Sequence, residues 1–208
     1  MKRYLIIFSL TLLGLSCRKD VAINICGQRS YFYQGHKIYL TELNNKMTIS
    51  FTDSTTAQNK VNILSQFSYL NSIESSVESP NENYVIVSFK NFTDCQTANS
   101  RIAQLKSNPK IIMANLLLTY KNQGIEGIVG LTNLFIVKLK TSSTKQDLDQ
   151  FALQTHTSVI GRPPFGIDTL TYIINADKYS NGDALDMANW FYLTDKFEYS
   201  EPNFIVLQ

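Results

Sequence analysis

Few side chains in this sequence have the types and spacing that enzyme chemistry needs. The two histidines, His36 and His156, lie far apart, and no His-x-x-x-His or Cys-x-x-Cys spacing indicates a metal site. Gly-x-Ser-x-Gly and phosphate-loop motifs are also missing from the sequence. His36 lies beside an expected hairpin turn, and His156 follows an expected helix, where the dipole favours a cation. We therefore predict a non-enzymatic protein with no catalytic residue, metal or cofactor.

The N-terminus has the features of an export signal. Lys2 and Arg3 precede an apolar run over residues 4–13, which is too short to span a bilayer. The run ends in Leu-Gly-Leu-Ser-Cys17, which resembles the bacterial lipobox except that Gly14 stands where leucine is usual. The alternative is an ordinary cleaved signal with a coincidental cysteine. We predict that residues 1–16 are a lipoprotein-type signal peptide, that Cys17 is lipidated, and that the protein is anchored to the bacterial cell envelope, at the outer membrane or surface.

The other cysteines, Cys26 and Cys95, leave two interpretations open. They would form a disulfide readily in an exported protein. Cys95 also falls on the apolar face of an expected helix, where it would serve as a small core residue. Two cysteines do not decide between these interpretations.

Formal charge argues against nucleic-acid binding. Lys2 and Arg3 are the two basic residues of the signal, which contains none of the 17 acidic residues. The remaining chain therefore has equal numbers of acidic and basic residues, and its formal net charge is zero. A nucleic-acid-binding protein would be expected to carry a basic excess.

Similar patterns recur 86 residues apart. Residues 84–90 and 170–176 are both apolar strand candidates, and residues 47–51 correspond to 133–137. A helical stripe at Ala98, Ile102 and Leu105 corresponds to Ala184, Ala188 and Phe191. We expect an α+β protein with two tandem ferredoxin-like (βαββαβ) units, each an antiparallel sheet backed by two helices.

This repeat sets the expected boundaries. The units span 46–121 and 133–208, after an N-terminal segment over 17–45, and a linker over 122–132 contains Gly124, Gly127 and Gly130. In the N-terminal segment, residues 31–40 predict a hairpin that turns at Gln34-Gly35. Expected helix N-caps are Thr144 with Asp147 as a capping box, Thr93 or Asp94, and Asn181.

Three segments resemble the N-terminal pro-region of bacterial subtilisin-like serine peptidases. They are Tyr31-Phe-Tyr-Gln-Gly-His-Lys-Ile-Tyr-Leu40, Phe135-Ile-Val-Lys-Leu-Lys140, and Asn181-Gly-Asp-Ala-Leu-Asp-Met-Ala-Asn-Trp-Phe-Tyr192 leading into Phe197-Glu-Tyr-Ser-Glu-Pro-Asn-Phe204. The most specific part is the signature Tyr199, Glu201, Pro202 and Asn203, interpreted as a turn into the final strand. The resemblance covers nearly all of the chain after the signal. The peptidase domain of that family carries Asp-Thr/Ser-Gly, His-Gly-Thr and Gly-Thr-Ser motifs, and none of these motifs occurs in this sequence.

The resemblance implies a binding role. In that family the pro-region is a folding chaperone and temporary inhibitor, whose sheet packs on the peptidase and whose C-terminal tail enters the active-site cleft. It implies a subtilisin-like peptidase as partner and a protease-binding tail at Phe204, Ile205, Val206, Leu207 and Gln208. Sheet completion by Phe204 to Val206 is the alternative for the tail. Two other functions stay open: an envelope interaction or adhesion module without a peptidase partner, and the orphaned N-terminal part of a subtilisin-like peptidase.

Overall fold

The computed structural model describes residues 25–79, 82–91, 93–122, 125–164 and 168–207, so the predicted signal and Cys17 lie outside the described residues. The described chain contains four helices: α1 (Ala57–Leu64), α2 (Cys95–Lys106), α3 (Lys145–Thr155) and α4 (Ala184–Leu193). It contains nine strands: β1 (Ile25–Tyr33), β2 (His36–Phe51), β3 (Ser75–Ser79), β4 (Glu82–Ser88), β5 (Ile111–Asn122), β6 (Ile125–Leu139), β7 (Ser158–Gly161), β8 (Thr171–Asn175) and β9 (Phe197–Leu207). Within the described residues, no helix is both long and apolar enough to cross a bilayer.

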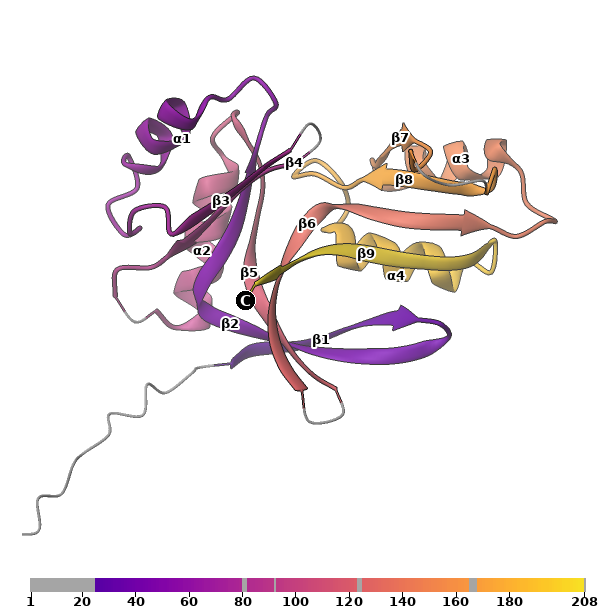
Figure 1. Ribbon diagram of the computed structural model, residues 1–208, viewed down its shortest axis with the longest axis horizontal. Coiled ribbons are helices and arrows are strands. Elements are labelled where there is room, and N and C mark those ends of the chain that lie inside the picture. Colours follow the sequence, from indigo (N-terminus) through magenta and orange to yellow (C-terminus); the bar gives the residue numbers. More distant parts are fainter. Residues whose placement is uncertain (1–24, 80–81, 92, 123–124, 165–167, 208) are drawn as a thin grey trace, which may run out of the picture.

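All described strands belong to one antiparallel sheet, and the expectation of two separate ferredoxin-like sheets is therefore wrong. The strand order is β3-β4-β2-β5-β6-β8-β7, with β1 beside β2 and β9 beside β6 (Figure 1). Strand-helix-strand-strand-helix-strand does recur along the chain. However, β5 and β6 pair directly, Leu118–Asn122 against Ile125–Val129, and this ladder joins the two sets of strands. Below, the first half denotes residues 36–122 and the second half residues 125–207.

The expected linker over 122–132 is mostly strand. β6 begins at Ile125 and continues to Leu139, and β2 likewise crosses the expected boundary at residue 45. The glycines here make room for neighbouring side chains: a Cβ on Gly127 would lie 2.5 Å from Cε1 of Tyr120, and one on Gly130 would lie 2.4 Å from Cγ2 of Thr48. Glycine in a strand can mark such close approach as well as a chain break.

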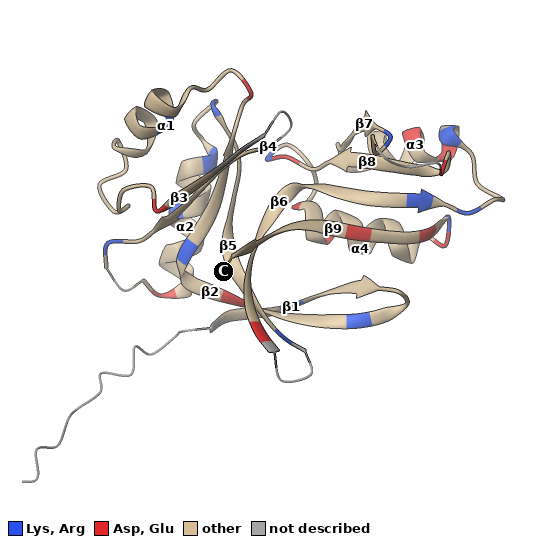
Figure 2. Cartoon of the chain, viewed as in Figure 1, with Lys and Arg blue, Asp and Glu red and all other residues tan. Residues whose placement is uncertain are grey.

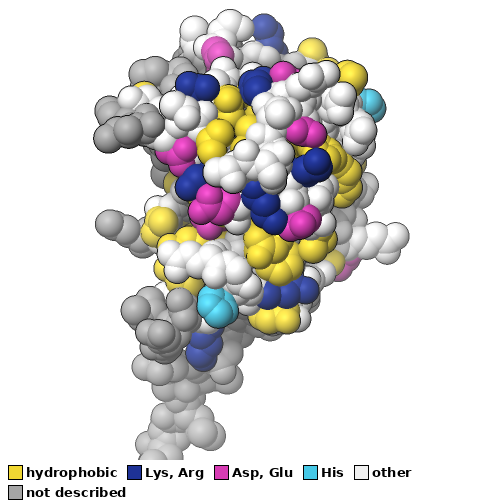
Figure 3. All heavy atoms as spheres, turned by 90° about the vertical axis from the view of Figure 1, so that its right-hand side faces the viewer, with side chains coloured by type: hydrophobic (Ala, Val, Ile, Leu, Met, Phe, Trp, Pro, Cys, Tyr) yellow, Lys and Arg dark blue, Asp and Glu magenta, His cyan; other side chains and the backbone are white. Residues whose placement is uncertain are grey.

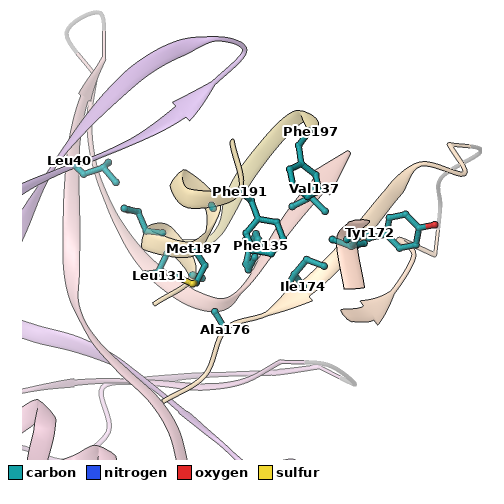
Figure 4. Close-up of a cluster of buried hydrophobic side chains, with 14 of the residues drawn as sticks. Leu40, Leu131, Phe135, Val137, Tyr172, Ile174, Ala176, Met187, Phe191 and Phe197 are labelled. Atoms are coloured by element: carbon teal, nitrogen blue, oxygen red, sulfur yellow. The ribbon is translucent and has the colours of Figure 1, made fainter. Parts of the chain in front are cut away.

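The hydrophobic core has one large cluster in each half. The first lies between α2 and strands β2, β4 and β5, and it includes Met47, Ile49, Val87, Leu105 and Ala114. The second lies between α3, α4 and strands β6, β8 and β9, with Leu40 of β2 and Leu118 of β5 added from the first half. Phe135, Phe191 and Phe197 are in ring contact at its centre (Figure 4). A small third cluster of Leu43, Ile86 and Leu117 packs against Leu207 from the end of β9. The end of the chain therefore rests on the first half.

The expected hairpin is confirmed. Strands β1 and β2 pair from Tyr33 opposite His36 back toward Ile25. The turn residues Gln34 and Gly35 have positive φ angles of 49° and 78°. Two consecutive positive φ angles are the property of a type I′ turn, which suits the twist of paired strands.

Two of the expected helix starts are confirmed and one is wrong. Asp94 caps α2, and Thr144 forms a capping box with Asp147 at α3. Asn181 does not cap α4; its side-chain amide donates instead to the Gln154 carbonyl. Asp183 is the cap, and its carboxylate accepts from the backbone N–H groups of residues 185 and 186.

Cys26 and Cys95 form a disulfide. It joins the start of β1 to the first residue of α2, across a sequence separation of 69 residues. The bond decides between the two interpretations that the sequence left open, and it fixes the entry of the chain into the sheet.

Candidate interaction site

The described residues contain no cluster of histidine, cysteine or carboxylate side chains suited to a metal ion. His36 lies next to the hairpin turn, and His156 is the C-cap of α3, with a left-handed φ of 55°. Acidic and basic positions are spread over both halves of the described chain (Figure 2). The charged side chains that lie close together in the described residues form ion pairs, and the ion pairs are the groups from which a site could be built.

The main charged cluster joins β1 to the start of α4. Arg29 donates two hydrogen bonds to Asp183, of 2.6 and 2.8 Å, and one of 2.6 Å to Asp186. Burial alone would lower the pKa of Arg29, but the hydrogen bond and charge of Asp183 outweigh it and the pKa is raised. Burial alone would likewise raise the pKa of Asp183, but Arg29 lowers it. The clasp, as we call the ion pairs of Arg29 with Asp183 and Asp186, links β1 to the start of α4.

A pocket of about 250 Å³ opens beside this clasp, at the junction of the two halves. Its lining includes Lys106, Lys178, Asp183 and Asp186. Burial lowers the pKa of Lys106, although the charge of Asp183 opposes the shift. Lys178 donates to the carbonyl of Asn108 at 2.7 Å, so it ties the second half to the first. Because Arg29 holds both carboxylates, we interpret the pocket as part of a structural junction.

Sequence reasoning did not find this clasp. Arg29 and Asp183 are separated by 154 positions, and no local pattern connects them. The one available signal was Asp183 itself, which lies immediately before α4 and is a good N-cap type.

The three segments that carry the pro-region resemblance pack together in the structure. Tyr31 of the hairpin meets Phe204 of β9, with ring centroids 5.3 Å apart. Phe32 stacks on Tyr192 of α4 at 4.3 Å. Phe135 of β6 lies 5.1 Å from Phe191 of α4. Hairpin, β6, α4 and β9 therefore form one packed unit.

The signature residues lie inside β9, so their interpretation as a turn is wrong. β9 begins at Phe197 and includes Tyr199, Glu201, Pro202 and Asn203. The register shifts where β6 passes residues 132–134, and Thr132 donates there to the carbonyl of Asn203 at 3.0 Å. Pro202 sits beside this irregularity on a strand that, among the strands the structure describes, pairs with β6 alone, where the missing N–H is tolerated.

The tail is also held in the sheet. Residues from Phe204 to Leu207 pair with β6 from Leu131 back to Ile128, so the expected sheet completion by Phe204 to Val206 is confirmed. Leu207 is anchored on the first half as well. Gln208 lies outside the described residues. The predicted protease-binding tail is therefore paired with β6 along its described length, from Phe204 to Leu207.

The second half presents a sheet face opposite its helices. Phe135 and Val137 point into the core with α4, so the alternating residues Ile136 and Lys138 point the other way. Ile136 pairs with Ile173 of β8 and with Glu201 of β9. The open face, as we call this surface, consists of Ile136, Lys138, Ile160, Ile173, Tyr199 and Glu201.

The open face combines apolar and charged side chains. Ile136 and Ile173 are half-buried, and Ile160 on β7 is 58% exposed. Lys138 pairs with Asp168 at 3.2 Å and with Glu198 at 2.9 Å. Burial raises the pKa of Glu201, whose carboxylate accepts a hydrogen bond from the backbone of Gln34. An apolar centre with a charged rim is suited to contact with another protein.

Comparison with known proteins adds no family assignment: no protein-family model matches the chain, and a search of curated proteins finds no match. The resemblance to subtilisin-type pro-regions therefore stays a prediction.

Proposed function

We propose that this chain is an exported, lipid-anchored, non-catalytic protein that binds a subtilisin-like serine peptidase through the open face and inhibits it or assists its folding. The observation that carries the proposal is the apolar centre of that face, with half-buried Ile136 and Ile173 and exposed Ile160, on the side of the sheet that α3 and α4 leave free. The hairpin, β6, α4 and β9 carry the resemblance to subtilisin-type pro-regions, and this resemblance is the reason for proposing a subtilisin-like peptidase as the partner.

Because the C-terminal tail is paired with β6, we place the proposed peptidase contact on the open face and not on the tail. An inhibitor tail has to leave its own protein to lie in a cleft as an added strand. Here Phe204 to Leu207 are paired with β6, and Leu207 is packed on the first half. Binding through the tail would require breaking this ladder, whereas the open face needs no rearrangement.

The disulfide supports an exported protein. Such bonds persist in oxidising compartments and are rare in a reducing cytosol. Cys26 and Cys95 are joined, and the third cysteine in the sequence, Cys17, directly follows the predicted signal over residues 1–16. Replacing Cys17 with alanine is expected to move the protein from the membrane fraction to the soluble fraction. Unchanged partitioning of Cys17→Ala would contradict lipidation at this residue.

Titration of a subtilisin-type peptidase with the purified protein tests the proposal. We expect inhibition that saturates with added protein. Ile160→Asp should weaken it by at least about tenfold, because an interface core does not tolerate an unpaired charge. Leu153→Asp is the matched control, since Leu153 is 77% exposed on α3, away from the open face. Equal effects of the two variants would exclude the open face, and the absence of inhibition and of binding would favour an envelope module without a peptidase partner.

A further inference from the structure

The pocket beside the clasp is lined by an amino group that the structural junction does not use. Lys106, the last residue of α2, contributes its side chain to the lining. Within the part of the chain that the structure describes, its amino group makes neither a hydrogen bond nor an ion pair. Lys178 lines the same pocket, but its amino group donates to the carbonyl of Asn108 at 2.7 Å. The pocket therefore contains one lysine that is held by a neighbour and one that can contact a ligand.

Lysines at the outer end of the second half differ from Lys106. Lys138, Lys140, Lys145 and Lys196 each form an ion pair with a carboxylate. Figure 3 shows basic side chains lying next to acidic ones on this end of the molecule. An ion pair stabilises the protonated form of an amine, and an ammonium group has no lone pair with which to attack carbon. These lysines are therefore poor nucleophiles.

The surroundings of Lys106 favour its neutral form. Burial lowers the pKa of Lys106, the charge of Asp183 opposes this shift, and the charge of Arg29 lowers the pKa further. The net effect is a pKa below the ordinary lysine value. Desolvation and a neighbouring cation are the two means by which proteins activate a lysine for attack on a carbonyl carbon. Lys106 has both of them, together with a pocket that gives access to its amino group.

The charges beside the pocket limit the kind of ligand. The Arg29 guanidinium is shared among three carboxylates. Two of them belong to Asp183 and Asp186, and that of Glu42 lies 3.6 Å from Arg29 Nη1. A ligand that carried a further carboxylate or a phosphate would be repelled by this excess of negative charge. The volume of about 250 Å³ lies below the usual ~300–1,000 Å³ of drug-sized sites, so the ligand has to be small as well as neutral.

We propose that Lys106 is a covalent binding site for small neutral aldehydes. The lone pair of its Nζ attacks the carbonyl carbon, and the carbinolamine that forms loses water to leave a C=N bond. The aldehyde oxygen and the two amine protons depart as that water, so the step needs no oxidant or reductant. A protonated imine keeps the positive charge next to Asp186, which lines the pocket. This is reversible binding without turnover, and it is independent of the peptidase partner.

Reductive labelling of the folded protein tests the proposal. Limiting propanal with sodium cyanoborohydride at neutral pH converts each imine into a stable secondary amine, and peptide mapping by mass spectrometry reads every lysine separately from the N-terminal amine. We expect Lys106 to be labelled several-fold faster than Lys178, which is the matched control within the same pocket. In urea-unfolded protein the two rates should become equal, because the preference depends on the folded pocket. Labelling of Lys106 no faster than that of Lys178 in the folded protein, or a preference that survives unfolding, would overturn the proposal.

The same assay checks the activation of Lys106 and the choice of ligand. The pH profile of labelling at Lys106 should have its midpoint below 10.5, the ordinary lysine pKa. The ratio of labelling at Lys106 to that at Lys178 should be higher with propanal than with glyoxylate, because glyoxylate carries a carboxylate. A higher ratio with glyoxylate would contradict a site for neutral aldehydes. Lys106→Arg keeps a cation at this position and should abolish the fast phase of lysine labelling, and a fast phase that persists in this variant would exclude Lys106 as its source.

Discussion

Asp183 is the residue whose replacement most clearly tests how β1 is held against α4. Its carboxylate accepts two of the three hydrogen bonds that the Arg29 guanidinium donates, and it also caps α4 by accepting from the N–H groups of residues 185 and 186 at 3.0 and 3.1 Å. Asparagine is nearly the same size and is a good N-cap. Asp183→Asn therefore keeps the cap and removes the charge that Arg29 needs.

The expected loss follows from the burial of the pair. The Arg29 and Asp183 side chains are only 17% and 13% exposed. Removing one partner of a buried ion pair typically costs ~3–5 kcal/mol, because the other charge stays buried and unpaired. Arg29 retains Asp186, which is 54% exposed, so we expect the lower end, about 3 kcal/mol. For a chain of this size that corresponds to a fall in Tm of ~6–12 °C.

Urea unfolding followed by circular dichroism measures this loss, and a constant m value shows that the folded and unfolded states remain comparable. Thr144→Ala is the control, since it removes the cap of α3 without an ion pair and should cost about 1 kcal/mol. A loss in Asp183→Asn no larger than in Thr144→Ala would refute the clasp.

The acid side of the stability profile gives a second readout of the same variant. The pKa of Asp183 is lowered in the folded protein from 3.8, so its contribution is present above that value and is lost as the pH falls through the lower, folded-state pKa. Asp183→Asn has no such group. Its stability should therefore fall less steeply with acidification than that of the unaltered protein.

Three further changes test other parts of the fold. Gly130→Ala should destabilise the protein by ~1–3 kcal/mol because its Cβ would clash with the methyl group of Thr48 at 2.4 Å, and adding Thr48→Ser should restore much of the loss in thermal melts. Cys95→Ala should lower the free energy of unfolding by roughly 4 kcal/mol, the loop-closure value for a separation of 69 residues from Cys26, and reduction of the unaltered protein should have the same effect on Tm. Deleting residues 207–208 should cost about 1–2 kcal/mol through the lost packing of Leu207 on the first half, while peptidase inhibition stays unchanged; inhibition lost with stability retained would return the binding site to the tail.

Local chemistry made several elements of this fold predictable from sequence. The Gln34-Gly35 turn, the capping box at Thr144 and the apolar stripe of α4 each depend on residues a few positions apart. Their energetics are set by nearby backbone geometry, so a sequence pattern suffices to find them.

Contacts between distant segments could not be predicted in the same way. The sheet is continuous because β6 begins at Ile125. This start lies in a glycine-rich stretch that, from its sequence, is typical of a connector between units. The glycines are there because Tyr120 and Thr48 approach closely, and those neighbours are defined only by the folded register. The choice of the open face as the binding surface depends on a similar long-range contact, since the pairing of Phe204 to Leu207 with β6 holds the tail in the sheet.

Hydrogen exchange on a complex with a subtilisin-type peptidase whose catalytic serine is replaced by alanine tests the central claim most directly. If the peptidase lies on the open face, backbone amides of β6 and β8 at residues 134–138 and 171–175 should exchange more slowly in the complex, while residues 204–207 should change little. Protection confined to residues 204–207 would contradict the account by placing the peptidase on the tail. Unchanged exchange throughout the chain at saturating peptidase would contradict the peptidase partner itself.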